Sequence, residues 1–205
     1  MSALIKNAKR HLRKIDPVMA RLMAIHDPYG SAPAKPRYTP YYHVLVQSVI
    51  NQQLSVKAAQ TISARMRVRQ GGRHFSAERV LALRVAAMRR CGVSGSKARY
   101  IRTLSRAVVA GELNFRKLVR QSDDTIRSLL TQYPGIGPWS VDMFLMFALH
   151  RPDVLPLGDL VLRKSMQRHY GLAAGAKDDA YLNVAAAWRP YRSIASRYLW
   201  AAAAS

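Results

Sequence analysis

The chain has 205 residues, 49% of them hydrophobic, which is enough to bury the core of one large domain or of two packed helical lobes. Its 33 lysines and arginines against 11 aspartates and glutamates give a formal net charge of +22, which favours a polyanion such as nucleic acid as partner. Cys91 is the only cysteine and the histidines are scattered, so an internal disulfide, a four-cysteine cluster and a metal cofactor are excluded as expectations.

Lysines and arginines interrupt the first residues from Lys6 to Lys14, which is unlike a secretory signal. No apolar run approaches the about 20 residues that a membrane span requires. We therefore expect no membrane partner and a cytoplasmic protein, associated with the nucleoid if its source is bacterial.

Apolar residues recur at helical spacing along almost the whole chain, and no alternating strand pattern interrupts them. The first predicted helix covers 4–26 with a break at Asp16-Pro17, and a loop rich in proline and glycine follows at 27–40. One helix is expected from the N-cap Ser76 to Gly92. Further helices are predicted at 41–51, 55–69, 96–110, 115–120, 126–133, 139–149, 160–170, 177–188 and 191–203. The expected fold class is all-α.

A tight turn is predicted at Pro134-Gly135-Ile136-Gly137-Pro138, between two of these helices. Glycines at 135 and 137 allow positive φ and a close approach of bare backbone to a ligand, while Ile136 is expected to pack inward. The second helix begins with N–H groups that no earlier turn satisfies, and such a terminus suits a phosphate. The same turn also suits a plain helix–helix connection.

Asp159 follows Gly158 and precedes an apolar helical run, which is the usual position of an N-cap. A cap carboxylate is fixed in direction at the positive end of the helix dipole. Such a group can also stabilise the oxocarbenium-like transition state of glycosidic bond cleavage, or activate the attacking water. Arg163, one turn later, could pair with Asp159 and make it less available.

These segments together resemble the helix-hairpin-helix DNA glycosylases, in which a hairpin and a Gly/Pro-rich loop precede an aspartate. Within that superfamily, the chain is most similar to the DNA-3-methyladenine glycosylase II branch. The similarity spans roughly 40–200 and rests on Pro134-Gly135-Ile136-Gly137, Leu157-Gly158-Asp159, and the stretches 48–55, 91–94, 97–101, 137–140 and 188–193.

The resemblance implies a single glycosylase unit of two helical lobes, with the hairpin and with an active-site cleft between the lobes. One lobe is expected to combine approximately 1–40 and 135–205, the other to cover 41–134, and no N-terminal sheet domain is expected. It implies a DNA repair enzyme that flips alkylated purines such as 3-methyladenine or 7-methylguanine out of the duplex and hydrolyses the N-glycosidic bond. Bifunctional relatives carry a lysine nucleophile where this chain has Trp139, so the enzyme is expected to leave an abasic site without cutting the strand.

The resemblance also assigns roles to further residues. Trp139, Met143 and Trp200 are expected in the base pocket, where an aromatic face attracts a cationic base, although Trp200 could equally be core packing. Gln53, or else Leu54, is expected to fill the gap that the flipped base leaves, while Gln52 could simply bond a helix end. Asp159 is the expected catalytic residue, and Pro134, Gly135, Ile136 and Gly137 the expected contact to the DNA backbone. No cofactor is expected, apart from room for a monovalent cation at the hairpin, and the protein is expected to bind damaged double-stranded DNA as a monomer.

Two other functions fit the same residues. The chain could be a helix-hairpin-helix DNA-binding protein without catalysis, in which Asp159 is only a cap. It could also be the same enzyme acting on neutral lesions, such as ethenoadenine or hypoxanthine.

Overall fold

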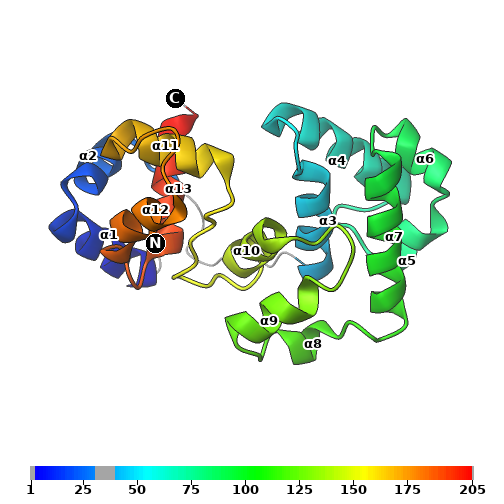
Figure 1. Ribbon diagram of the computed structural model, residues 1–205. Helices are drawn as coiled ribbons and strands as arrows, with labels where there is room; N and C mark the ends of the chain where they lie inside the picture. The colour runs from blue at the N-terminus through cyan, green and yellow to red at the C-terminus, as the bar shows by residue number, and fades with distance from the viewer. Residues whose placement is uncertain (1–2, 31–39, 205) are drawn as a thin grey trace. The chain divides into compact units, whose positions relative to one another are not determined.

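The computed structural model describes residues 3–30 and 40–204, and in this part of the chain it contains thirteen helices and no strand (Figure 1). The all-α fold class is therefore confirmed. Residues 31–39, the middle of the predicted loop at 27–40, lie outside the described residues. The helices are α1 (Ala3–Ile15), α2 (Pro17–Ile25), α3 (Tyr41–Asn51), α4 (Val56–Gln70), α5 (Ala77–Ala82), α6 (Val85–Arg90), α7 (Gly95–Val109), α8 (Phe115–Leu118), α9 (Asp123–Leu130), α10 (Pro138–Phe147), α11 (Leu160–Tyr170), α12 (Asp178–Ala186) and α13 (Arg192–Ala203).

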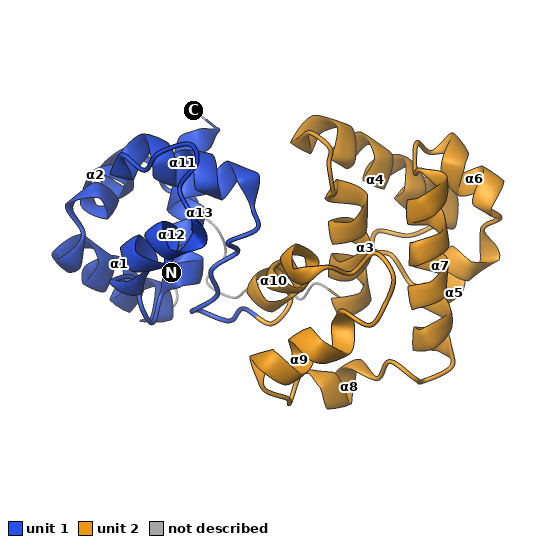
Figure 2. Ribbon diagram, in the orientation of Figure 1, with its two compact units in different colours: residues 1–37, 150–205 blue, residues 38–149 orange. Residues whose placement is uncertain are grey.

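The chain forms two compact units, coloured separately in Figure 2. Unit 1 contains 1–37 and 150–205, and unit 2 contains 38–149. The boundary thus follows α10, whereas the expected division placed 135–149 with the other lobe. The difference arises because α10 packs against α3 and α9, which belong to unit 2.

In unit 1, the buried carboxylate of Asp16 joins segments that are far apart in the sequence. Its Oδ1 accepts hydrogen bonds from the N–H groups of Val18 and Met19 at 2.9 and 3.0 Å, which caps α2 and explains the break between α1 and α2. Its Oδ2 accepts from the Tyr170 hydroxyl and from Trp188 Nε1, both at 2.8 Å. All four bonds offset the cost of burying a charge in the core that α1, α2, α11, α12 and α13 share.

In unit 2, α3 lies between α10 on one side and α4 and α7 on the other, and its apolar side chains are almost all buried. The segment expected to form one helix from Ser76 to Gly92 instead forms α5 and α6, so that prediction was wrong. The break falls at Leu83 and Arg84, where the guanidinium of Arg102 donates to the carbonyls of Leu81 and Leu83. A side chain from α7 therefore satisfies carbonyls that a continuous helix would have paired internally.

No helix among the described residues combines the length and the apolar character that crossing a membrane would require.

Candidate active site

Asp159 caps α11 and is held from two directions, both within unit 1. Its Oδ1 accepts a hydrogen bond from the Leu162 N–H at 2.8 Å, in the first turn of the helix. The same oxygen accepts one from Trp200 Nε1 at 3.0 Å, on α13. Because both donors fix one oxygen, the carboxylate has a defined direction at the positive end of α11.

Arg163, which the sequence offered as a possible partner of Asp159, binds other groups instead. Its Nη1 donates to Asp178 Oδ1 at 2.6 Å, its Nη2 donates to the Ala176 carbonyl at 3.2 Å, and the guanidinium lies 4.1 Å from the centre of the Tyr181 ring. The arginine is thereby turned toward α12, and its ion pair is with Asp178.

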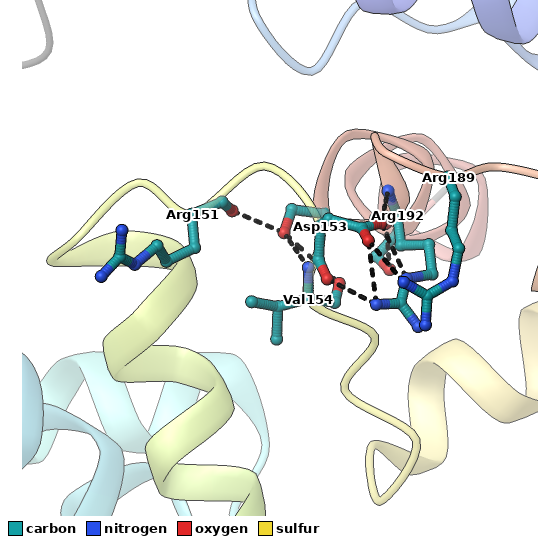
Figure 3. A network of polar contacts seen from close by, with 7 residues as sticks. Arg151, Asp153, Val154, Arg189 and Arg192 are labelled. Carbon is teal, nitrogen blue, oxygen red and sulfur yellow. Dashed lines mark hydrogen bonds and ion pairs between the residues drawn. The ribbon is translucent and has the colours of Figure 1, made fainter. Parts of the chain in front are cut away.

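The loop that leads to Asp159 is fixed to the start of α13, as Figure 3 shows. Arg192 binds the Asp153 carboxylate with two parallel bonds, Nε to Oδ1 at 2.8 Å and Nη2 to Oδ2 at 3.0 Å, and Arg189 adds a third at 3.1 Å. A bidentate pair of this kind restricts both distance and orientation. The anchor lies six residues before Asp159.

Ser193 completes this anchor through the backbone. Its hydroxyl donates to the Arg151 carbonyl at 2.7 Å and accepts from the Val154 N–H at 2.9 Å, while its own N–H donates to the Pro152 carbonyl at 3.0 Å. Helix α13 therefore holds the loop with its first two residues and Asp159 itself with Trp200.

The predicted hairpin connects α9 and α10 in unit 2. Gly135 has a φ of +82°, and a Cβ built there would lie 2.4 Å from Cδ2 of Tyr100, so a larger residue would clash as well as be strained. Ile136 is buried, as expected, with 4% of its surface exposed. No side chain caps the N-terminus of α10 at Gly137, and Pro138 occupies its first position.

Gly137 differs from the expectation of positive φ. Its φ is −94° and its ψ is 177°, which any residue can adopt, and a Cβ there would meet no atom within 4 Å. The reason for glycine at this position is thus not backbone strain. An absent side chain leaves the surface before α10 open to an approaching group.

Gln52 fixes the hairpin from the end of α3. Its Nε2 donates to the Gly135 carbonyl at 2.8 Å and to the Ser140 hydroxyl at 3.0 Å. The Gln52 carbonyl in turn accepts from Lys97 Nζ at 2.6 Å, and that ammonium also donates to the Ile50 carbonyl at 2.9 Å. Burial lowers the pKa of Lys97. The predicted link of Gln52 to a helix end is thereby observed, and the helix is the one that follows the hairpin.

The two predicted wedge residues follow directly on this anchored loop. Gln53 is exposed and has a φ of +56°, a left-handed conformation that a residue with a side chain seldom adopts. Leu54 keeps 39% of its surface exposed. An exposed apolar side chain and a strained neighbour are held on a backbone that Lys97 and Gln52 restrain.

Trp139 and Met143 lie one turn apart on α10, and they differ in exposure. Trp139 is partly exposed, whereas Met143 is buried with 8% of its surface exposed. The same helix carries Asp142, whose Oδ1 lies 2.7 Å from Nη2 of Arg127 on α9. Burial raises the pKa of Asp142, and the Arg127 guanidinium opposes that shift. Because Arg127 lies on α9 and Asp142 on α10, their ion pair joins the two helices of the hairpin.

Nowhere in residues 3–30 and 40–204 do three histidine, cysteine, aspartate or glutamate side chains gather in a way that could hold a metal ion.

The sequence prediction missed most of the residues that hold the site in place. Nothing in the sequence around Asp153 and Arg192 distinguishes them from other polar residues. For Gln52 a bond to a helix end was predicted, but its contact with the Gly135 carbonyl was not. One signal was present, since Arg192 and Ser193 belong to a stretch that carried the family resemblance without an assigned role.

The chain is similar in sequence to proteins named as DNA-3-methyladenine glycosylases. The Bacillus subtilis protein YfjP, by its provisional name a DNA-3-methyladenine glycosylase, is 32% identical over 87% of this chain, which spans 64% of that protein. DNA-3-methyladenine glycosylase 1 of Schizosaccharomyces pombe is 29% identical over 96% of this chain and 86% of its own length.

Solved structures match the whole fold. The Schizosaccharomyces pombe 3-methyladenine DNA glycosylase in complex with abasic DNA superposes with a TM-score of 0.84 and 29% identity, over 95% of each chain. A DNA-3-methyladenine glycosidase from Bacillus halodurans gives a TM-score of 0.75 with 32% identity, over 97% of this chain and 89% of that one.

The profile of one family covers most of the sequence, residues 46–190, including the hairpin and Asp159. The chain belongs to the HhH-GPD superfamily of base excision DNA repair proteins.

Proposed function

We propose that this protein is a monofunctional DNA glycosylase that removes alkylated purines of the 3-methyladenine and 7-methylguanine type and leaves an abasic site. The observation that carries the proposal is the carboxylate of Asp159, which the Leu162 N–H and Trp200 Nε1 hold at the start of α11. The names of the relatives and the abasic DNA in the Schizosaccharomyces pombe structure support the same substrate class.

The chemistry asked of Asp159 is modest for such a substrate. An alkylated purine is cationic, so its N-glycosidic bond is already weak and the base leaves as a neutral molecule. The bond electrons go to the base, the sugar acquires positive charge at C1′, and water adds there with loss of a proton. A fixed carboxylate lowers the free energy of that transition state through its negative charge, and it can accept the proton of the water.

The other residues take their proposed roles from the resemblance and from local geometry. The hairpin, Pro134 to Gly137, would bind a phosphate through its backbone, with room for a monovalent cation at its carbonyls and no other cofactor. Gln53 or Leu54 would fill the gap in the base stack. The resemblance assigns Trp139, Met143 and Trp200 to the base pocket, and Trp139 is partly exposed, as a cation–π contact with a base requires.

The proposed partner is damaged double-stranded DNA, bound by a monomer in the cytoplasm, at the nucleoid if the source is bacterial. Treatment with a metal chelator should leave the rate of base release unchanged, because no proposed step uses a divalent ion.

The decisive test is release of free base from duplexes that each carry one lesion. We expect release of 3-methyladenine and 7-methylguanine, with the strand intact until alkali is added. If free base is released only from duplexes with ethenoadenine or hypoxanthine, the substrates are neutral lesions. Strand cleavage without alkali would contradict monofunctional action.

Asp159→Asn separates the enzyme from a DNA-binding protein without catalysis. The amide keeps the size of the side chain but removes its charge, so base release should fall by at least about 10³-fold while duplex binding persists. Asp179→Asn is the matched control, because it neutralises an exposed carboxylate of the same unit and leaves the ion pair of Arg163 with Asp178 intact. Full activity of Asp159→Asn would leave Asp159 as a helix cap only.

A further inference from the structure

Helix α1 carries a stripe of positive charge that the proposed site does not use. Five of the nine residues at positions 6–14 of this helix are lysine or arginine, and the helix contains no aspartate or glutamate. At 100° per residue they fall on one side of the helix, opposite the buried Ala8 and Leu12. A hollow in the protein surface is lined, among the described residues, by these five side chains alone: Lys6, Lys9, Arg10, Arg13 and Lys14. We refer to them as the α1 stripe.

Unit 1 offers little negative charge to neutralise the stripe. Lys9 pairs with Asp27 at 3.1 Å and lies 5.9 Å from the centres of the Tyr29 and Tyr198 rings. In the part of unit 1 that the structure describes, the other four stripe residues make no ion pair, and they are exposed.

Other carboxylates of unit 1 are bound by other residues. Asp16 is buried and bonded to Tyr170 and Trp188, and Asp153 is bound by Arg192. Four exposed cations on one helical face repel one another, at a cost in helix stability. The helix dipole explains Arg13 and Lys14 in the last turn, yet it disfavours Lys6 near the N-terminus.

Three classes of anionic partner could use such a surface, and the structure favours one. A lipid surface would need an apolar face of α1 to insert, but Ala8 and Leu12 are fully buried in the core of unit 1. An interface with an acidic protein normally has apolar or aromatic side chains at its centre. The hollow has none, because lysines and arginines alone line it among the described residues. A nucleic-acid backbone requires only spaced cations.

The spacing of the stripe suits a duplex. Lys6 and Lys14 are eight residues apart, which is about 12 Å along the helix axis. A DNA duplex presents one phosphate per about 1.7 Å of its axis, both strands counted, so this length faces about seven phosphates. We propose that the α1 stripe binds the DNA phosphate backbone at a site additional to the hairpin and holds undamaged DNA without regard to sequence. The inference rests on the proposed function only in taking DNA as the partner.

The test replaces the four exposed stripe residues together, as Lys6→Gln, Arg10→Gln, Arg13→Gln and Lys14→Gln. Glutamine keeps the helix propensity close to that of lysine and arginine, and Lys9 is left in its ion pair. Arg106→Gln, Arg116→Gln, Lys117→Gln and Arg120→Gln form the matched control, since they remove the same charge from exposed positions of unit 2. Circular dichroism checks that both variants fold.

Affinity for an undamaged duplex is measured by fluorescence anisotropy as a function of salt. We expect the slope of log K against log salt to become shallower by at least about 2 for the stripe variant, since each lost phosphate contact removes about 0.9. Its affinity near 0.15 M salt should fall by at least about tenfold, and the control should change far less. An unchanged slope for the stripe variant, or an equal change in both variants, would overturn the inference.

A second readout separates this inference from the proposed function. The stripe variant should release methylated base at the wild-type rate once DNA is saturating, because Asp159 and its contacts are intact. Normal base release with an unchanged salt slope refutes the stripe alone. A stripe-dependent slope in a protein that releases no base refutes the glycosylase and leaves the stripe as a DNA-binding surface.

Discussion

Asp159 illustrates how one residue can be explained by structure and by chemistry at once. Capping α11 requires a side-chain oxygen at this point, and the same requirement fixes the oxygen in space. Both Asp159 and Asp16, the cap of α2, also accept a hydrogen bond from an indole N–H. Asp16 is buried in the core of unit 1, whereas Asp159 is partly exposed. An oriented carboxylate that stays partly exposed is therefore the feature that points beyond a helix cap.

Trp200→Phe tests that contact while keeping an aromatic ring. A hydrogen bond to a charged group contributes about 1.5–3 kcal/mol, and each 1.4 kcal/mol corresponds to a tenfold change in rate. We expect the single-turnover rate of base release to fall by about 10- to 100-fold, with duplex affinity nearly unchanged. A wild-type rate for Trp200→Phe, with loss only in Trp200→Ala, would assign Trp200 to the pocket wall instead.

At the scale of elements, two loops owe their shape to distant helices. Both the loop before Asp159 and the loop after α3 contain backbone carbonyls and N–H groups that no regular structure satisfies. Side chains from α13 and α7 satisfy them: Ser193 and Arg192 in the first case, Lys97 in the second. Each loop is thereby given one conformation, which a proposed catalytic or wedge residue needs.

Arg192→Lys should loosen the loop that carries Asp159. Lysine retains the charge but cannot form the two parallel bonds to Asp153. We expect the single-turnover rate of base release to fall by about tenfold, and the melting temperature to fall by a few degrees, with DNA affinity preserved. Arg189→Lys is the matched control, because Arg189 is 62% exposed and contributes a single bond. Equal effects of the two substitutions would refute a positioning role for Arg192.

Gln52→Glu tests whether the contact of Gln52 with the hairpin is needed for DNA binding. A carboxylate cannot donate to the Gly135 carbonyl, and it places a negative charge beside the backbone that is proposed to bind a phosphate. Duplex affinity should fall by about tenfold in an anisotropy titration. Gln60→Glu makes the same change of charge at an exposed position on α4 and should have little effect. If both variants bind alike, the hairpin does not depend on Gln52.

At the scale of the whole molecule, the net charge of +22 is shared by both units. Paired arginines such as Arg127, Arg163 and Arg192 contribute to the fold, but many other cations face solvent. So large a charge raises the rate of encounter with a polyanion and destabilises the compact state through self-repulsion. Neutralisation by DNA phosphates would relieve that repulsion.

The affinity of the wild-type protein for an undamaged duplex should therefore depend steeply on salt. With hairpin and surface cations in contact with at least four phosphates, log K should fall by more than about 3 for each tenfold rise in salt. Titrations between 0.05 and about 0.3 M salt would measure this. A flat response would contradict DNA as the partner of this charge.

Most of the helix boundaries could be predicted from the sequence, because they depend on interactions over one or two turns. Asp16 and Pro17 divide the first helical segment, Ser122 begins α9 and Gly171 ends α11 by rules that involve only near neighbours. The turn at Gly135 and the cap at Asp159 are equally local. Their order along the chain is also what produced the family resemblance.

The tertiary structure decided everything that depends on a partner far away in the sequence. Trp200 reaches Asp159 across 41 positions, and Gln52 reaches Gly135 across 83. The split of the expected helix after Ser76 follows from Arg102, and the place of α10 in unit 2 follows from its packing on α3. Local preferences differ by less than about 1 kcal/mol per residue, so packing and long-range hydrogen bonds override them. The sequence by itself thus determined the helices, the hairpin and the candidate carboxylate, while only the packed core could decide which side chains hold them in place.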